Sequence, residues 1–295
     1  MKRIKYIVLS SVLAFSALIS GCVNQYEDSS TTIPSENNED IRLVITSPAI
    51  AEITDKLELE AVGICDTSFE IPKRYENVEK IGYAMSPDLE IVKSLNPDYV
   101  LSPLTLIEDL QPKYASIQVK SLFLNLKSVD GLYSAISDLG KILNRDEQAQ
   151  RLVDEYSTFI NEYKEKNKDK VAPKVLILMG LPGSYVVATE HSYAGSLVKL
   201  AGGINVYEDE TAEFINANTE DMKAKDPDII LRTAHALPDR VMEMFAEEFE
   251  TNDVWKHFRA VKENKVYDLS YERFGMSAKF NYPQALEELQ EILYS

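Results

Sequence analysis

Two side chains that can bind iron stand near matching places in the two halves of the chain. Met85 lies just ahead of a short predicted helix, and His235 lies just past a predicted apolar strand. A thioether and an imidazole together are an established pair of axial ligands for haem iron. If the two halves face each other across a cleft, Met85 and His235 would hold a haem between them.

The elements that must position these ligands form a unit that occurs twice. Five residues of the first copy recur 130 positions later: Glu90, Lys93, Pro97, Asp98 and Leu101 return as Glu220, Lys223, Pro227, Asp228 and Leu231. Each copy predicts a short helix that begins after an N-cap, Ser86 or Asn216, and stops before Pro-Asp. An apolar strand follows each helix, at 99–101 and at 229–231. One such unit in each half indicates two lobes built on one plan.

The residues alone leave other interpretations of these ligands open. Methionine most often fills gaps in a core, and this interpretation applies to Met85 unless a partner is present. Of the three histidines, His191 and His257 are interpreted as structural or surface residues. His235 differs because it follows a buried strand, and ligands of α/β proteins bind at the carboxyl ends of strands.

The N-terminus predicts an export signal and a lipid anchor. A cationic start is followed by the apolar run 6–18, and the stretch Leu18–Cys22 resembles the lipidation signal of bacterial lipoproteins. We expect residues 1–21 to be removed as a signal peptide and Cys22 to carry the lipid. Residues 22–40 are polar and predict a flexible tether. The mature protein is therefore expected on the extracytoplasmic face of the cell membrane, anchored through palmitate or similar acyl chains.

Composition excludes several classes of function. The formal charge of −17 becomes −20 when the three basic residues of the signal peptide are removed, so binding to nucleic acid is not expected. Metalloprotease, hydrolase and phosphate-binding motifs are absent from the sequence, which predicts that the protein is not an enzyme. Three scattered histidines do not supply the clustered ligands of a zinc or manganese receptor. Cys65 is the only cysteine besides Cys22 and is expected to be buried.

Strands alternate with helices along the rest of the chain, which predicts an α/β fold. We expect an N-terminal lobe at 41–144, a connecting helix at 145–170 and a C-terminal lobe at 171–295. The helical pattern Arg145–Lys168 is the longest and has no internal glycine or proline, so it predicts a stiff connector.

These features resemble the substrate-binding lipoproteins that serve iron-siderophore, cobalamin and haem transporters. The resemblance rests on the strand leading into Ser47–Pro48, on Asp88–Ile91 with Pro97–Asp98, and on 218–220 with Pro227–Asp228. It implies a class III substrate-binding protein: two Rossmann-like lobes joined by a single long α-helix. It also implies that a ligand lies in the groove between the lobes and is delivered to an ABC permease.

Within that class, the stretches 82–90 and 232–235 look like the haem-receptor lipoproteins of iron-regulated surface determinant systems. This resemblance implies that Met85 and His235 are the axial ligands of a transported haem, and that Glu90 and Glu220 dock to arginines of the permease. It further implies a cell-wall haem-donor protein as a partner, and we expect the protein to be a monomer. Two alternatives remain: a siderophore or cobalamin receptor of the same fold, and a surface haem scavenger without a permease.

The haem propionates need hydrogen-bond donors in an otherwise acidic protein. The predicted helix start at Thr46, Ser47 and Ala49 offers free backbone N–H groups and the positive end of a helix dipole. The strand ends at 100–101 and 229–231, together with Phe274, are expected to supply apolar walls for the porphyrin.

Overall fold

The computed structural model describes residues 41–295. The predicted signal peptide, Cys22 and the whole predicted tether lie outside the described residues. Within 41–295, no helix combines the length and the apolar character that crossing a lipid bilayer requires.

The first half of the described chain forms a six-stranded sheet in the order β4-β3-β2-β1-β5-β6. Its strands are β1 (Leu43–Ile45), β2 (Gly63–Asp66), β3 (Glu79–Tyr83), β4 (Ser86–Pro87), β5 (Tyr99–Pro103) and β6 (Ser121–Leu124). All neighbouring pairs are parallel except β3 and β4, which form an antiparallel hairpin.

The second half forms another sheet in the order β10-β8-β7-β11-β12, with β9 paired to β7. Its strands are β7 (Lys174–Leu181), β8 (Ser184–Ala188), β9 (Ile204–Asn205), β10 (Phe214–Asn216), β11 (Ile229–Ala234) and β12 (Val266–Asp268). Strand β11 pairs in parallel with both of its neighbours, β7 and β12, whereas β8 runs antiparallel to both of its neighbours. Both sheets are thus mainly parallel, as the alternation of strands and helices predicted.

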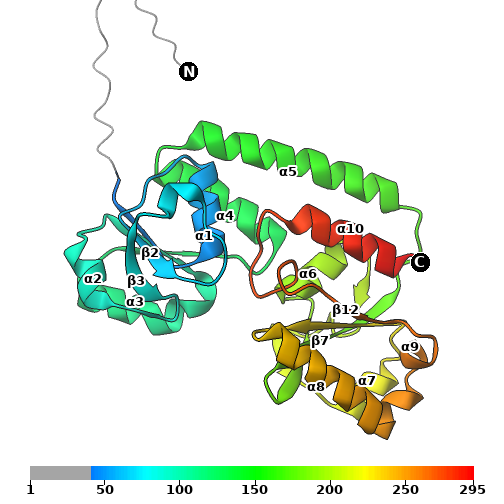
Figure 1. Cartoon of the computed structure of the whole chain (residues 1–295). Helices are drawn as coiled ribbons and strands as arrows, with labels where there is room; N and C mark the ends of the chain where they lie inside the picture. Colours follow the sequence, from blue (N-terminus) through cyan, green and yellow to red (C-terminus); the bar gives the residue numbers. More distant parts are fainter. Residues whose placement is uncertain (1–40) are drawn as a thin grey trace, which may run out of the picture. The chain divides into compact units, whose positions relative to one another are not determined.

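Ten α-helices accompany these sheets in residues 41–295 (Figure 1). They are α1 (Pro48–Lys56), α2 (Leu89–Ser94), α3 (Ile107–Ser116), α4 (Val129–Ile142), α5 (Asp146–Asn167), α6 (Tyr193–Leu200), α7 (Thr219–Ala224), α8 (Pro238–Thr251), α9 (Arg259–Lys262) and α10 (Tyr282–Leu293). Three short 3₁₀ turns occur at Lys73–Tyr75, Leu104–Leu106 and Asp253–His257.

Helix α5 is the connector that the long helical pattern predicted, and it packs along α4 and α10 (Figure 1). The rings of Tyr133 and Tyr156 stack at 4.1 Å between α4 and α5. The Tyr163 hydroxyl donates to the Leu286 carbonyl at 2.8 Å and so joins α5 to α10. A single apolar core cluster contains residues of both sheets, so the two halves share packing beside this connector.

Both copies of the repeated unit are present in the structure, but their helices have other N-caps than the sequence predicted. The side chain of Asp88 accepts hydrogen bonds from the first turn of α2, and that of Asn218 does the same for α7. The predicted caps Ser86 and Asn216 are wrong because both residues still belong to strands, β4 and β10. The observed caps, Asp88 and Asn218, are also 130 positions apart, so they add another pair of equivalent positions to the repeat.

Candidate functional site

Met85 lies at the tip of the β3–β4 hairpin. Tyr83 pairs with Ser86 across this hairpin. Gly82, just before this pair, has a φ of 84°, a backbone conformation that glycine adopts far more easily than other residues. The Met85 side chain is 71% exposed. An exposed thioether contributes nothing to a core, so the gap-filling interpretation of Met85 does not apply.

His235 lies immediately after the central strand β11 and is exposed. Its backbone N–H donates to the Gly180 carbonyl at 2.9 Å, which extends the β11–β7 ladder by one residue and fixes the start of the loop. His191 and His257 are also exposed, but they lie ahead of α6 and in a 3₁₀ turn. His235 is therefore the histidine at the carboxyl end of a parallel strand, where α/β proteins bind ligands.

The three residues predicted to hold propionates differ in what they can donate. The Thr46 hydroxyl is buried between the Leu101 carbonyl and the Ser102 hydroxyl, at 3.1 and 2.9 Å, and its backbone N–H also donates to Leu101. Thr46 therefore has no free donor in this structure. Ser47 is the N-cap of α1, but its side chain makes no capping hydrogen bond. Ala49 precedes the first bond of the helix ladder, so its N–H has no partner within the helix.

Ser47 and Ala49 line a cavity of about 130 Å³ between the two halves of the chain. The first half also contributes Pro48 and Phe69, and the second contributes Tyr271, Glu272, Gly275, Met276, Ser277 and Lys279. The rings of Phe69 and Tyr271 stack at 5.8 Å, and the Lys279 ammonium lies 4.2 Å from the centre of the Phe69 ring. Sequence reasoning missed Lys279 and Tyr271, because nothing local marks residues that meet α1 only through the fold.

Helix α1 also carries Glu52, a carboxyl group that is affected by the charge of the cavity residue Lys279. Burial raises the pKa of Glu52, although the charge of Lys279 and a hydrogen bond from the Phe280 backbone act in the opposite direction. Lys279 therefore brings positive charge to a region where burial already disfavours a carboxylate. An anionic group that entered the cavity would meet this same ammonium.

Glu90 and Glu220 occupy equivalent positions in the first turns of α2 and α7. Both side chains are exposed, and within residues 41–295 neither carboxylate takes part in an ion pair. Their backbone N–H groups are held by Asp88 and Asn218, which leaves both carboxylates available to a partner.

The predicted apolar walls are mostly unavailable to a ligand. Phe274 is fully buried in the main core cluster, where its carbonyl accepts a hydrogen bond from Thr233. The strand residues 100–101 and 229–231 are at most 3% exposed. The expectation that these residues line the porphyrin is wrong, because their side chains are buried in the apolar core clusters.

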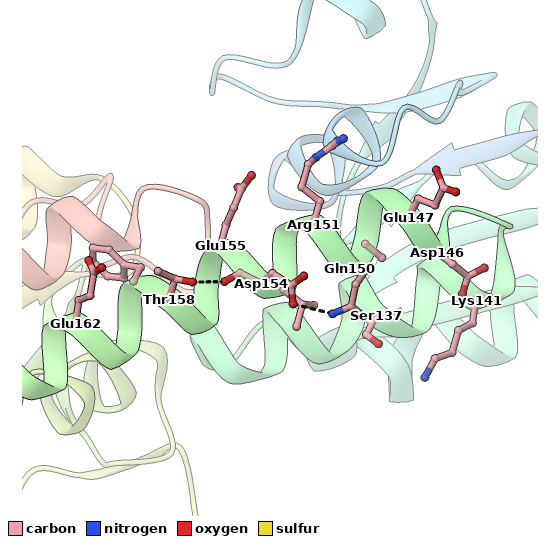
Figure 2. A pocket seen from close by; sticks show the side chains of 13 residues that line it. Ser137, Lys141, Asp146, Glu147, Gln150, Arg151, Asp154, Glu155, Thr158 and Glu162 are labelled. Carbon is pink, nitrogen blue, oxygen red and sulfur yellow. Dashed lines mark hydrogen bonds between the residues drawn. The ribbon is translucent and has the colours of Figure 1, made fainter.

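Another hollow in the described part of the chain lies along α4 and α5 (Figure 2). Figure 2 shows its polar side chains on the outer surface of these helices, with Asp154 accepting a hydrogen bond from Gln150. Five acidic residues line it against two basic ones: Asp146, Glu147, Asp154, Glu155 and Glu162 against Lys141 and Arg151. This open acidic groove contains none of the predicted site residues and is unsuited to an anionic ligand.

Comparison with known proteins decides the family. The sequence profile of periplasmic binding proteins matches residues 43–272. The chain belongs to the periplasmic binding protein family. A curated relative, the high-affinity heme uptake system protein IsdE of Staphylococcus aureus strain Newman, is 41% identical over 300 aligned residues, which cover 100% of this chain and 99% of the relative.

Solved members of the family have the same fold. An ABC transporter substrate-binding protein from Listeria monocytogenes EGD-e is 47% identical with a TM-score of 0.83, covering 87% of this chain and 99% of that one. S. aureus IsdE complexed with heme is 42% identical with a TM-score of 0.81, covering 86% and 99%. The predicted two-lobed class III architecture is thereby confirmed, as is the prediction that the chain is a transport protein rather than an enzyme.

Proposed function

We propose that this protein captures haem and delivers it to an ABC permease for iron acquisition. The observation that carries the proposal is the exposure of a thioether and an imidazole, Met85 and His235, on loops at the ends of two different sheets. One ligand comes from each half of the chain, so haem iron would bridge the two. The names of the 41% identical uptake protein and of the haem-bound structure support this ligand over a siderophore.

A siderophore receptor has different requirements. The ligands of a ferric siderophore already fill the iron coordination sphere, so its receptor needs no methionine and histidine pair. Soft sulfur and imidazole donors in solvent-accessible positions instead suit a ligand whose iron has two open axial sites.

The cavity between the halves is proposed as the place for the propionate-bearing edge. Its volume of about 130 Å³ lies below the range of roughly 300–1,000 Å³ that encloses a whole small ligand, so the porphyrin plate would extend outside it. The free Ser47 hydroxyl, the Ala49 N–H and the Lys279 ammonium would bind the carboxylates. Thr46 would act behind them by fixing the loop through Ser102.

Glu90 and Glu220 are proposed to dock the protein on the permease. A pair of exposed carboxylates at equivalent positions suits a pair of arginine sites, where charge-assisted hydrogen bonds fix orientation. Uptake by a Glu90→Ala, Glu220→Ala double variant is expected to fail while haemin binding remains. Normal uptake by this variant would remove the docking role.

The lipid anchor is proposed on Cys22, with residues 22–40 as the tether and a cell-wall haem-donor protein upstream of a monomeric receptor. Cys22→Ala is expected to leave the precursor uncleaved or to release the protein from the membrane fraction. An unchanged mature mass in an unchanged membrane fraction would contradict the anchor.

Haemin titration of the soluble domain tests the ligand and the iron ligation. Wild type is expected to give a low-spin, six-coordinate Soret spectrum, which Met85→Ala and His235→Ala both alter. His235→Ala is expected to weaken binding more, because ferric iron prefers imidazole to thioether. The matched control is His191→Ala, which removes an exposed histidine outside the two ligand loops. A wild-type spectrum in both ligand variants would reject this ligation, and an absent Soret change in wild type would favour the siderophore alternative.

A further inference from the structure

Seven residues other than glycine have a positive φ in the described part of the chain. Six of them follow directly on the C-cap of a helix: Glu58, Asn96, Gln118, Asn144, Asp226 and Asn264. A left-handed residue at this position is the common way to end a helix, because it lets backbone N–H groups reach the last free carbonyls. Leu237 is the seventh, and it does not end a helix.

Leu237 instead stands at the N-cap of α8, with φ 49° and ψ 58°. An N-cap residue normally has extended backbone and a Ser, Thr, Asp or Asn side chain that accepts from the first turn. Leu237 has neither feature, and Pro238 follows it, a neighbour that favours extended backbone. Its apolar side chain is also 54% exposed. Neither helix capping nor core packing accounts for this residue.

The strained residue ends the loop that carries the proposed histidine ligand. His235 is held to Gly180 at one end, and Pro238 begins α8 at the other, so the loop contains only three residues. With both ends fixed, the backbone of Leu237 decides how the chain turns from the strand into the helix. Strained backbone that surrounding structure maintains is concentrated at functional sites.

Exposed apolar side chains also gather at the two ligand loops. Six large hydrophobic residues are exposed within residues 41–295: Tyr83, Met85, Ile142, Val171, Ile204 and Leu237. Tyr83 precedes Met85 by two positions, and Leu237 follows His235 by two. Besides Met85 itself, two of the other five exposed residues thus lie within two positions of a proposed iron ligand, which is expected where a large apolar ligand will cover them.

We propose that Leu237 is the positioning residue of the histidine side of the haem site. Its left-handed backbone sets the turn that presents the His235 imidazole, and its side chain covers the porphyrin face beside that imidazole and keeps water from the iron–nitrogen bond. This inference rests on the proposed haem-binding function. It adds a residue that binds no iron, donates no hydrogen bond to the ligand and nevertheless controls how long the ligand stays.

Two substitutions separate the backbone role from the side-chain role. Asparagine adopts left-handed backbone readily, so Leu237→Asn keeps the turn and removes the apolar cover. Leu237→Gly removes the cover and also frees the backbone. Val171→Asn is the control for losing an exposed apolar side chain, and Gln118→Gly is the control for relieving a left-handed residue elsewhere.

Haem release to excess apomyoglobin and the EPR spectrum of the ferric complex are the two measurements. Leu237→Asn is expected to release haem about tenfold faster with wild-type g values, because a water-exposed iron–imidazole bond breaks more easily while its geometry persists. Leu237→Gly is expected to release haem faster still and to broaden the low-spin EPR signal, since the imidazole would adopt a range of orientations. Both controls are expected to match wild type in each measurement.

Two results would overturn the inference separately from the function. Wild-type release from Leu237→Asn would remove the covering role, and a sharp, wild-type EPR signal in Leu237→Gly would remove the positioning role. A wild-type protein without a Soret response would instead overturn the haem-binding function itself, and the inference with it.

Discussion

The cap of α7 connects local helix stability to the proposed docking of the permease. The Asn218 side chain accepts from the Glu220 and Asp221 N–H groups at 3.1 and 3.2 Å. Replacement of an N-cap by alanine costs about 1 kcal/mol, and α7 has only six residues, too few to be stable by itself. Asn218→Ala should therefore raise the local opening equilibrium of α7 about fivefold.

Hydrogen exchange measures this opening directly. The Met222 N–H donates to the Asn218 carbonyl at 2.9 Å, and the Lys225 N–H donates to Asp221 at 3.0 Å. Exchange in the peptide 219–225 should accelerate about fivefold in Asn218→Ala, whereas haemin affinity should stay at the wild-type value. Uptake should fall, because a helix that opens more often holds Glu220 less firmly for an arginine partner.

The repeat supplies its own conservative controls. Asp88 caps α2 with the same pair of bonds, so Asn218→Asp and Asp88→Asn exchange two good caps and should leave exchange and uptake nearly unchanged. Unaltered exchange in Asn218→Ala would refute the capping argument. Faster exchange with full uptake would refute the link between this helix and the permease.

Three further predictions concern single buried or charged groups. Burial raises the pKa of Cys65 to about 11, so iodoacetamide at pH 8 should label Cys65 only after unfolding, as mass spectrometry would detect. Burial opposes ionisation of Asp228, but hydrogen bonds from the Lys174 N–H and Arg259 outweigh it and hold the pKa of Asp228 below the usual 3.8. In urea unfolding, the wild-type protein should therefore be more stable than Asp228→Asn at pH 6, and this difference should shrink below pH 3.8 as Asp228 becomes protonated. A Cβ on Gly180 would lie 2.2 Å from the Val241 side chain, so Gly180→Ala should lower the free energy of unfolding by roughly 1–3 kcal/mol, measured as a lower Tm. The same variant should weaken haemin binding, because the Gly180 carbonyl holds the His235 backbone.

The repeat explains why so much of the fold could be predicted from the sequence. Asn96 and Asp226 both adopt left-handed backbone after their helices. Asp98 accepts a backbone N–H from the residue just before β1, and Asp228 accepts one from the first residue of β7. These roles belong to local residue types, so a recurring pattern reveals them. The cap positions were misjudged by two residues because the pattern does not show where β4 and β10 end.

The cavity between the halves was beyond sequence reasoning for a different reason. Lys279 meets Phe69 across more than two hundred positions of chain, and their contact depends on how both halves pack. Phe274 shows the converse error, since an aromatic residue five positions before Lys279 is fully buried while its neighbours line the cavity. Residue type alone does not separate a buried aromatic side chain from one that faces a ligand.

The proposed ligands also depart from the repeat, and this departure has a physical reason. Met85 corresponds by the same offset to Ile215, which packs against the second core cluster, and His235 corresponds to Thr105, which lies in a 3₁₀ turn. Helix caps and the carboxylates proposed for docking repeat because each half makes the same local structure and would present the same kind of group to a permease. Haem iron has two axial sites that chemically different donors can fill, so the site gains from lobes that differ at this point. The repeat therefore identifies the scaffold that the two halves share. The proposed binding site lies where the two copies differ, and where Leu237 departs from the usual residue type and backbone conformation of an N-cap.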